Sequence, residues 1–208
     1  MMDPQETSST DTESAVTDFV ALLLLSVTAV LTAWCGFQSS KWGGEMSIAF
    51  SEASSLRIQA TSADSRARDA RQYDLSIYIE WVLADGDRKL RNYIEDRFTP
   101  EFKVAFEAWN AGGRTQPGPL AHPKYSPSGA ADAARLDHLA DEKFQSALEK
   151  NQQGDNYTLL TVAFALVLFL TALSQRKQAQ TVKKALLALA VVVAVISVVI
   201  MLTFPALI

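Results

Sequence analysis

The chain has 208 residues, 49% hydrophobic and 20% charged, with a formal net charge of −4. These averages are those of a soluble domain, but the apolar residues are concentrated in three uncharged stretches. The net negative charge, without a groove of basic and aromatic residues, excludes nucleic acid as the expected partner. A single cysteine, Cys35, excludes an internal disulfide.

Residues 1–17 are acidic and lack hydrophobic bulk, so we expect a disordered tail. The first uncharged stretch then predicts transmembrane helix 1 at residues 18–37. A cleaved signal peptide needs a basic flank, and the flank here is acidic. We therefore expect this segment to stay in the protein as a membrane anchor.

From Thr28 to Trp81 one row of residues recurs every three or four positions, which is typical of one face of a continuous helix. The first part of the row is a polar stripe on the predicted membrane helix: Thr28, Thr32, Cys35 and Ser39. Beyond it lies a seam of mostly small residues: Ala49, Ala53, Leu56, Ala60, Ala63, Ala67, Ala70, Asp74, Ile77 and Trp81. The helix is expected to run to about residue 84, with a kink at Gly43 and Gly44 as the alternative.

Turn and cap signals divide the predicted extramembrane domain, residues 38–155. Gly86 between two aspartates ends the long helix, and Thr99-Pro100 opens another. The elements expected are short helices 87–98 and 100–110, a Gly- and Pro-rich loop 111–126, and a return helix 127–153 that ends before Gly154. At a rise of about 1.5 Å per residue, the return helix is too short to reach the end of the long helix. We therefore expect aromatic residues of the short helices to cover that end: Phe98, Phe102, Phe106 and Trp109.

Two further uncharged stretches predict transmembrane helices 2 and 3, at 156–174 and 185–205, joined by a basic loop at 175–184. The positive-inside rule places this loop and the N-terminus in the cytoplasm, and the helical domain outside it. Lysines on the domain side oppose the assignment, but long domains translocate largely regardless of charge. The expected fold class is an all-α membrane protein whose long helical hairpin, coiled-coil-like, lies between the first and second spans.

The seam needs a partner helix. In a parallel homodimer Arg66 would face Arg71, an unfavourable pair of like charges. The return helix instead offers small apolar residues in antiparallel orientation, so we favour a hairpin within one chain. Apolar residues outside the seam exceed what this helix can cover, and we also expect a homo-oligomer.

Few residues suggest chemistry. The polar stripe is expected to be a packing face, with a pore in an oligomer as the alternative. Asp74 interrupts the seam and is expected to pair with Arg71, three residues earlier. His138, Asp141 and Glu142 lie within one helical turn, which we interpret as a solvated helix face rather than a metal site.

The sequence contains no P-loop, G-x-G-x-x-G, G-x-S-x-G or H-E-x-x-H motif. We therefore predict no catalytic residue, metal or cofactor, and a non-catalytic, membrane-anchored helical scaffold or interaction module that assembles with itself. A homo-oligomeric channel lined by the polar stripe is the alternative. The expected partners are the lipid bilayer, a second copy of the chain, and a protein whose identity the sequence does not give.

Two segments carry a resemblance: Ala33 to Gln38 followed by Lys41-Trp42, and Arg97 to Phe102 followed by Ala105 to Trp109. They resemble segments of an uncharacterised family of bacterial inner-membrane proteins that have one span, a helical domain and two C-terminal spans. The resemblance covers most of the chain and implies this architecture and a location in the bacterial inner membrane. That family has no assigned activity, so no site residue is transferred.

Overall fold

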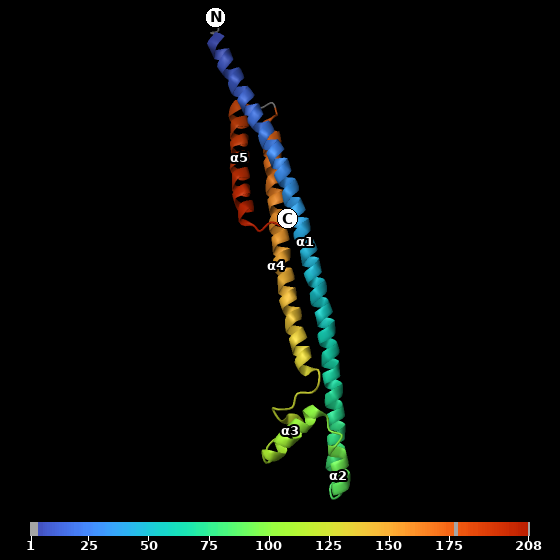
Figure 1. The fold of residues 1–208 in the computed structure, drawn as a ribbon. Helices are drawn as coiled ribbons and strands as arrows, with labels where there is room; N and C mark the ends of the chain where they lie inside the picture. The colour runs from blue at the N-terminus through green and yellow to red at the C-terminus, as the bar shows by residue number, and fades with distance from the viewer. Residues whose placement is uncertain (1–3, 177–178, 208) are drawn as a thin grey trace. The chain divides into compact units, whose positions relative to one another are not determined.

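The computed structural model describes residues 4–176 and 179–207, and every regular element in these ranges is a helix. In chain order the elements are α1 Pro4–Leu83, α2 Arg88–Glu95, α3 Pro100–Ala111, the 3-10 turn η1 Pro119–Ala121, α4 Ala130–Ser174 and α5 Gln180–Thr203 (Figure 1). Helices α1, α4 and α5 are each long and apolar enough to cross a membrane. The protein is therefore an all-helical membrane protein with three candidate spans.

Helix α1 is one continuous element of 80 residues that passes Gly43 and Gly44 without a break. A methyl group added at either glycine would meet no atom within 4 Å, so no close contact requires glycine there. The sequence predicts a disordered tail at residues 1–17. In the structure α1 already begins at Pro4. Proline suits a first helical position, where its missing N–H costs no hydrogen bond.

Helix α4 is also continuous, although the sequence predicts an end before Gly154. Gly154 is buried, and a methyl group there would lie 3.5 Å from the Ser39 carbonyl oxygen and 3.6 Å from Trp42 Cβ. These are ordinary van der Waals distances, so α4 packs against α1 at this glycine and continues through it. The helix begins at Ala130, after Gly129 with its φ of 92°, and not at residue 127.

Helix α5 begins earlier than expected, at Gln180, so the second half of the predicted basic loop is helical. Lys183 and Lys184 lie in its first turns. Lys177, another basic residue of that loop, lies outside the described residues.

The chain forms two compact units, one comprising the chain up to Ala49 and from Ser146 onward, the other Phe50–Gln145. In the first unit the membrane helices pack through two clusters of apolar residues. These are Cys35, Tyr157, Leu160 and Phe164, and Val167, Leu170, Ala190 and Ala194.

In the second unit α1 and α4 run antiparallel, as charge pairs between them show. Lys143 contacts Glu52 at 2.6 Å, and further along α1 the Arg57 guanidinium pairs with both Asp137 and Asp141. The intrachain helical hairpin is therefore present within this unit.

The end of α1 in the second unit is covered as the sequence predicts. Thr99 caps α3 by accepting a hydrogen bond from the Phe102 amide at 3.2 Å, and Asp87 caps α2 by accepting from the Leu90 amide at 3.0 Å. The core that results joins all three helices: Ile77, Trp81, Ala84, Ile94, Phe98, Phe102, Phe106 and Trp109. Trp81 is further held by a 2.7 Å hydrogen bond from its indole nitrogen to Glu95.

Candidate functional site

The seam of α1 is buried along most of its length. Its buried members are Ala49, Ala53, Ala60, Ala63, Ala67, Asp74, Ile77 and Trp81, while Leu56 and Ala70 are half-buried. The chain passes close to the seam at Gly129, where an added methyl group would lie 2.8 Å from the Ala63 carbonyl oxygen. Within the second unit the seam is thus the packing face of the hairpin.

Asp74 is the charged member of the seam and is 1% exposed. Its two carboxylate oxygens accept hydrogen bonds from the Thr99 hydroxyl at 2.7 Å and from the Tyr125 hydroxyl at 2.8 Å. These hydroxyls replace the ion pair with Arg71 that the helical spacing predicts. Arg71 instead lies over the Tyr125 ring, 6.0 Å from its centroid.

Asp74 therefore ties α1 to the start of α3 and to the loop before α4. Thr99 takes part twice, because it donates to Asp74 and accepts from the backbone of α3. Burial and the hydrogen bond to Asp74 raise the pKa of Tyr125 well above its ordinary value. A buried carboxylate held by two hydroxyls in this way stabilises the fold.

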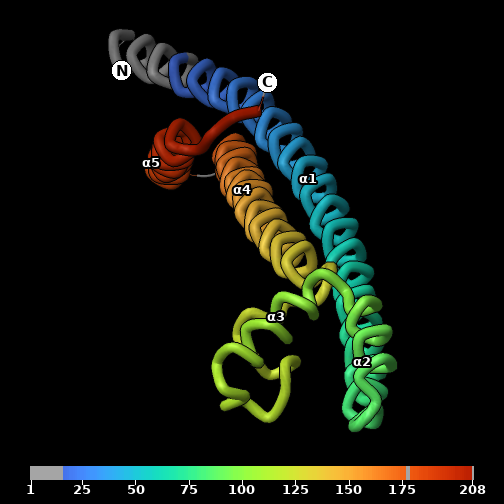
Figure 2. The backbone as a smooth tube through the Cα atoms, turned by 60° about the horizontal axis from the view of Figure 1, so that its bottom comes forward, coloured from blue at the N-terminus to red at the C-terminus, as the bar shows by residue number. Residues whose placement is uncertain are grey.

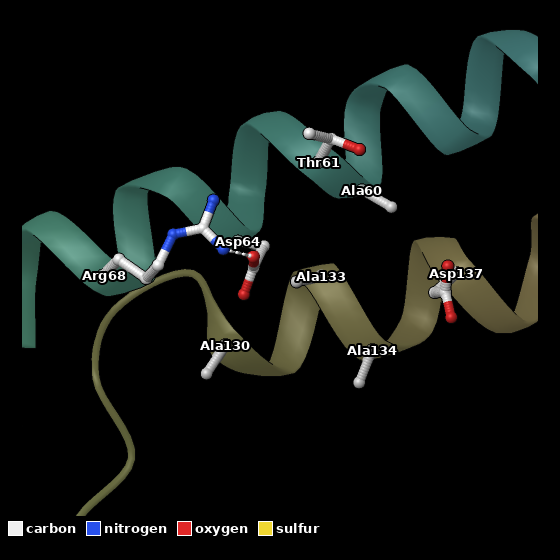
Figure 3. A pocket seen from close by; sticks show the side chains of 8 residues that line it. All are labelled: Ala60, Thr61, Asp64, Arg68, Ala130, Ala133, Ala134 and Asp137. Atoms are coloured by element: carbon white, nitrogen blue, oxygen red, sulfur yellow. Dashed lines mark hydrogen bonds and ion pairs between the residues drawn. The ribbon is translucent and has the colours of Figure 1, made fainter.

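A groove of about 500 Å³ lies between α1 and α4 in the second unit (Figure 3). Its lining combines small and charged side chains: Ala60, Thr61, Asp64, Arg68, Ala130, Ala133, Ala134 and Asp137. Arg68 is paired with Asp64 on the same helix, and Asp137 is paired with Arg57. The charges of this groove are thus matched within the chain.

A second groove, of about 430 Å³, lies between the end of α1 and α2, and we call it the distal groove. It is lined by Ile77, Glu80, Leu83, Ala84, Leu90, Tyr93, Ile94 and Arg97. Leu83 is 77% exposed and Tyr93 56% exposed. The distal groove therefore brings exposed apolar side chains of α1 and α2 together.

The sequence indicated surplus apolar residues outside the seam but did not identify the distal groove. Of the groove's α1 residues, Ile77 belongs to the seam, whereas Leu83 lies outside it, so the seam pattern did not indicate this surface. On α2, Ile94 is buried in the core, whereas Leu90 and Tyr93 face the groove.

The three residues with metal-ligand spacing on α4 do not converge. The His138 ring lies 3.4 Å from Glu142 and is largely exposed, while Asp141 pairs with Arg57. Within residues 4–176 and 179–207, no three His, Cys, Asp or Glu side chains come together as metal ligands.

The polar stripe of the first span faces other helices of the first unit. Thr28 and Cys35 are buried, and the Thr32 hydroxyl donates to the Thr28 carbonyl oxygen at 2.7 Å. The hydroxyls of Ser39 and Thr158 lie 2.8 Å apart, and Cys35 contacts the Met201 sulfur at 3.8 Å. This is the small-residue packing common between membrane helices.

The segment after α5 is clamped onto α1 and α4 (Figure 2). The buried Gln38 side chain donates to the Leu207 carbonyl oxygen and accepts from the Leu207 amide, both at 2.9 Å. Trp42 and Tyr157 donate to the Pro205 carbonyl oxygen at 3.3 and 3.2 Å. Sequence reasoning missed this C-terminal clamp, although Trp and Tyr near a span end are typical of the membrane interface.

The opposite ends of the spans are marked by an ion pair of 2.5 Å between Lys183 of α5 and Asp18 of α1. By helical rise, Asp18 and Gln38 are separated by about 30 Å along α1. This equals the thickness of a hydrocarbon core of about 30 Å. The ion pair and the C-terminal clamp therefore lie where the two membrane surfaces are expected.

No family model, curated protein or solved structure matches this chain.

Proposed function

We propose that the protein is a non-catalytic, membrane-anchored helical scaffold or interaction module, and that the distal groove is its interaction surface. The observation that carries the proposal is that Leu83 and Tyr93, both more than half exposed, border the distal groove beside the packed aromatic core. Exposed apolar patches of this kind mark protein interaction sites.

The buried and charged groups of the same unit support a structural role. Asp74 is satisfied by Thr99 and Tyr125, and Glu52 and Arg57 of α1 pair with Lys143, Asp137 and Asp141 of α4.

Self-assembly is part of the proposal, because a second copy offers the same apolar surface. The channel alternative has less support, since the side chains of the polar stripe contact helices of their own chain.

The proposed location is the bacterial inner membrane, with the N-terminus in the cytoplasm and the unit Phe50–Gln145 outside it. Arg176, Lys183 and Lys184 near the α4–α5 connection support this orientation through the positive-inside rule. The resemblance to bacterial inner-membrane proteins supports the choice of membrane.

Site-specific photo-crosslinking in intact cells tests the interaction surface. A photoreactive phenylalanine analogue replaces Leu83, and in a matched control it replaces Ile58, which is 71% exposed on the same helix but outside the groove. We expect a discrete crosslinked product from position 83 and none from position 58. A product of twice the chain mass identifies a second copy, and another mass identifies a different protein. Equal, diffuse labelling at both positions would contradict the proposal.

A further inference from the structure

A crevice of about 420 Å³ runs between α4 and α5 in the first unit. Leu160 and Ser197 form its floor, each 4% exposed. The rims are bulky side chains that face outward, Leu159 on α4 and Ile196 and Ile200 on α5. The crevice thus opens toward the hydrocarbon layer that surrounds the spans.

The crevice is apolar along its length and polar at one end. The Ser197 hydroxyl donates to the Val193 carbonyl oxygen at 2.8 Å, so the floor presents no unsatisfied donor. At the end near the C-terminal clamp lies Asn156, whose side-chain oxygen accepts from Gln152 at 3.0 Å. This is the polarity profile of a lipid that lies with its chain in the bilayer and its head at the surface.

The polar end also has a fixed aromatic wall. Phe204 lines the crevice and packs edge-on against Tyr157, with ring centroids 5.9 Å apart. Tyr157 in turn donates to the Pro205 carbonyl oxygen. The C-terminal clamp therefore sets the shape of this end of the crevice.

We propose that the crevice is a binding site for one acyl chain of a membrane phospholipid, with the headgroup beside Asn156. A helix of a second copy fits less well, because close approach of membrane helices needs small residues at the contact, and the rims here are leucine and isoleucine. A flexible hydrocarbon chain can enter between such rims. The site depends on the membrane-spanning fold and is independent of the proposed role of the distal groove.

The test uses the full chain reconstituted in phosphatidylethanolamine–phosphatidylglycerol vesicles that contain a trace of phosphatidylcholine with a diazirine in its acyl chain. After irradiation, peptide mass spectrometry maps the labelled residues. We expect label concentrated on residues that line the crevice, namely Leu159, Ala163, Val193, Ile196 and Ile200. Label spread over all lipid-facing residues, including Val162 and Phe169, in proportion to exposure would show ordinary bilayer contact only and would overturn the proposal.

A pair of substitutions sharpens the test. Ala163→Phe fills the crevice and should reduce crevice labelling several-fold, whereas Val162→Phe adds the same ring on the lipid-facing side and should leave it unchanged. If Ala163→Phe does not fold, Ile200→Trp blocks the opening from α5. A second outcome would also overturn the proposal. If two copies of the chain crosslink to each other in the vesicles and Ala163→Phe or Ile200→Trp abolishes that crosslink, a second copy occupies the crevice.

Discussion

Gln38 and Leu207 exchange two hydrogen bonds, each 2.9 Å long, between a side chain of the first span and the backbone beyond the third. The amide side chain of Gln38 is fully buried, so the pair satisfies polar groups that water does not reach. Gln38 thereby links two segments that lie far apart in the sequence.

Replacing Gln38 with leucine should release the segment after α5. Both bonds disappear, and each buried group left without a partner costs about 1–3 kcal/mol. We expect the Leu207 amide to exchange hydrogen much faster, as measured by hydrogen–deuterium exchange in detergent micelles. Gln38→Glu retains an acceptor for the Leu207 amide and should show intermediate protection. Unchanged protection in Gln38→Leu would contradict this account of the clamp.

Removing the Asp74 carboxylate should destabilise the second unit. Asp74→Ala leaves the Thr99 and Tyr125 hydroxyls without their acceptor, for which we expect a loss of about 1–3 kcal/mol in the free energy of unfolding. Denaturant unfolding in detergent, followed by tryptophan fluorescence, measures the loss. Asp69→Ala on the exposed side of α1 is the control and should change stability little. Equal effects at the two positions would show that the Asp74 contacts contribute no stability.

Tyr125 should make stability depend on pH in alkaline solution. Its pKa is raised in the folded state by burial and by the hydrogen bond to Asp74. Its contribution is therefore fully present below the ordinary tyrosine pKa of about 10 and declines as the pH rises above that value. Comparing the unfolding free energy of the wild type and Tyr125→Phe from about pH 9 to 11 isolates this contribution. The same pH slope in both proteins would exclude Tyr125 as its source.

Gly129→Ala should disturb the hairpin more than Gly86→Ala. Both glycines have φ near 90°, so both substitutions carry backbone strain. At Gly129 the new methyl group would also lie 2.8 Å from the Ala63 carbonyl oxygen, whereas at Gly86 it would meet nothing within 4 Å. The difference in thermal unfolding midpoint between the two variants measures the close approach of α1 to residue 129. Equal midpoints would show that α1 and the start of α4 adjust without cost.

Local signals in the sequence predicted the helices, their caps and the aromatic cover of α1. Periodicity identified the seam, and Thr99-Pro100 and Gly86 marked ends that the structure has. Gly154 shows the limit of such signals, because α4 continues through this glycine although glycine and aspartate in sequence are typical of a helix end.

Contacts between distant positions were beyond sequence reasoning. The partners of Asp74 are 25 and 51 residues away, while Arg71 is a near neighbour on the same helix, so helical spacing favoured the wrong partner. Gln38 and Leu207 are 169 residues apart, and their bonds involve the backbone of Leu207, which carries no signal in its residue type. The distal groove could not be predicted either, because its position depends on which face of α2 packs against the core.

The most direct test of the central claim, a membrane-anchored module whose second unit lies outside the cytoplasm, is labelling of two cysteines in intact cells. Ser128→Cys, before α4, and Gln175→Cys, between α4 and α5, are each placed in a Cys35→Ala background, because Cys35 is the only native cysteine. With a membrane-impermeant maleimide, the account predicts that position 128 reacts in intact cells and position 175 only after lysis. Reaction of both positions in intact cells would contradict the three-span architecture, and the reverse pattern would place the second unit in the cytoplasm.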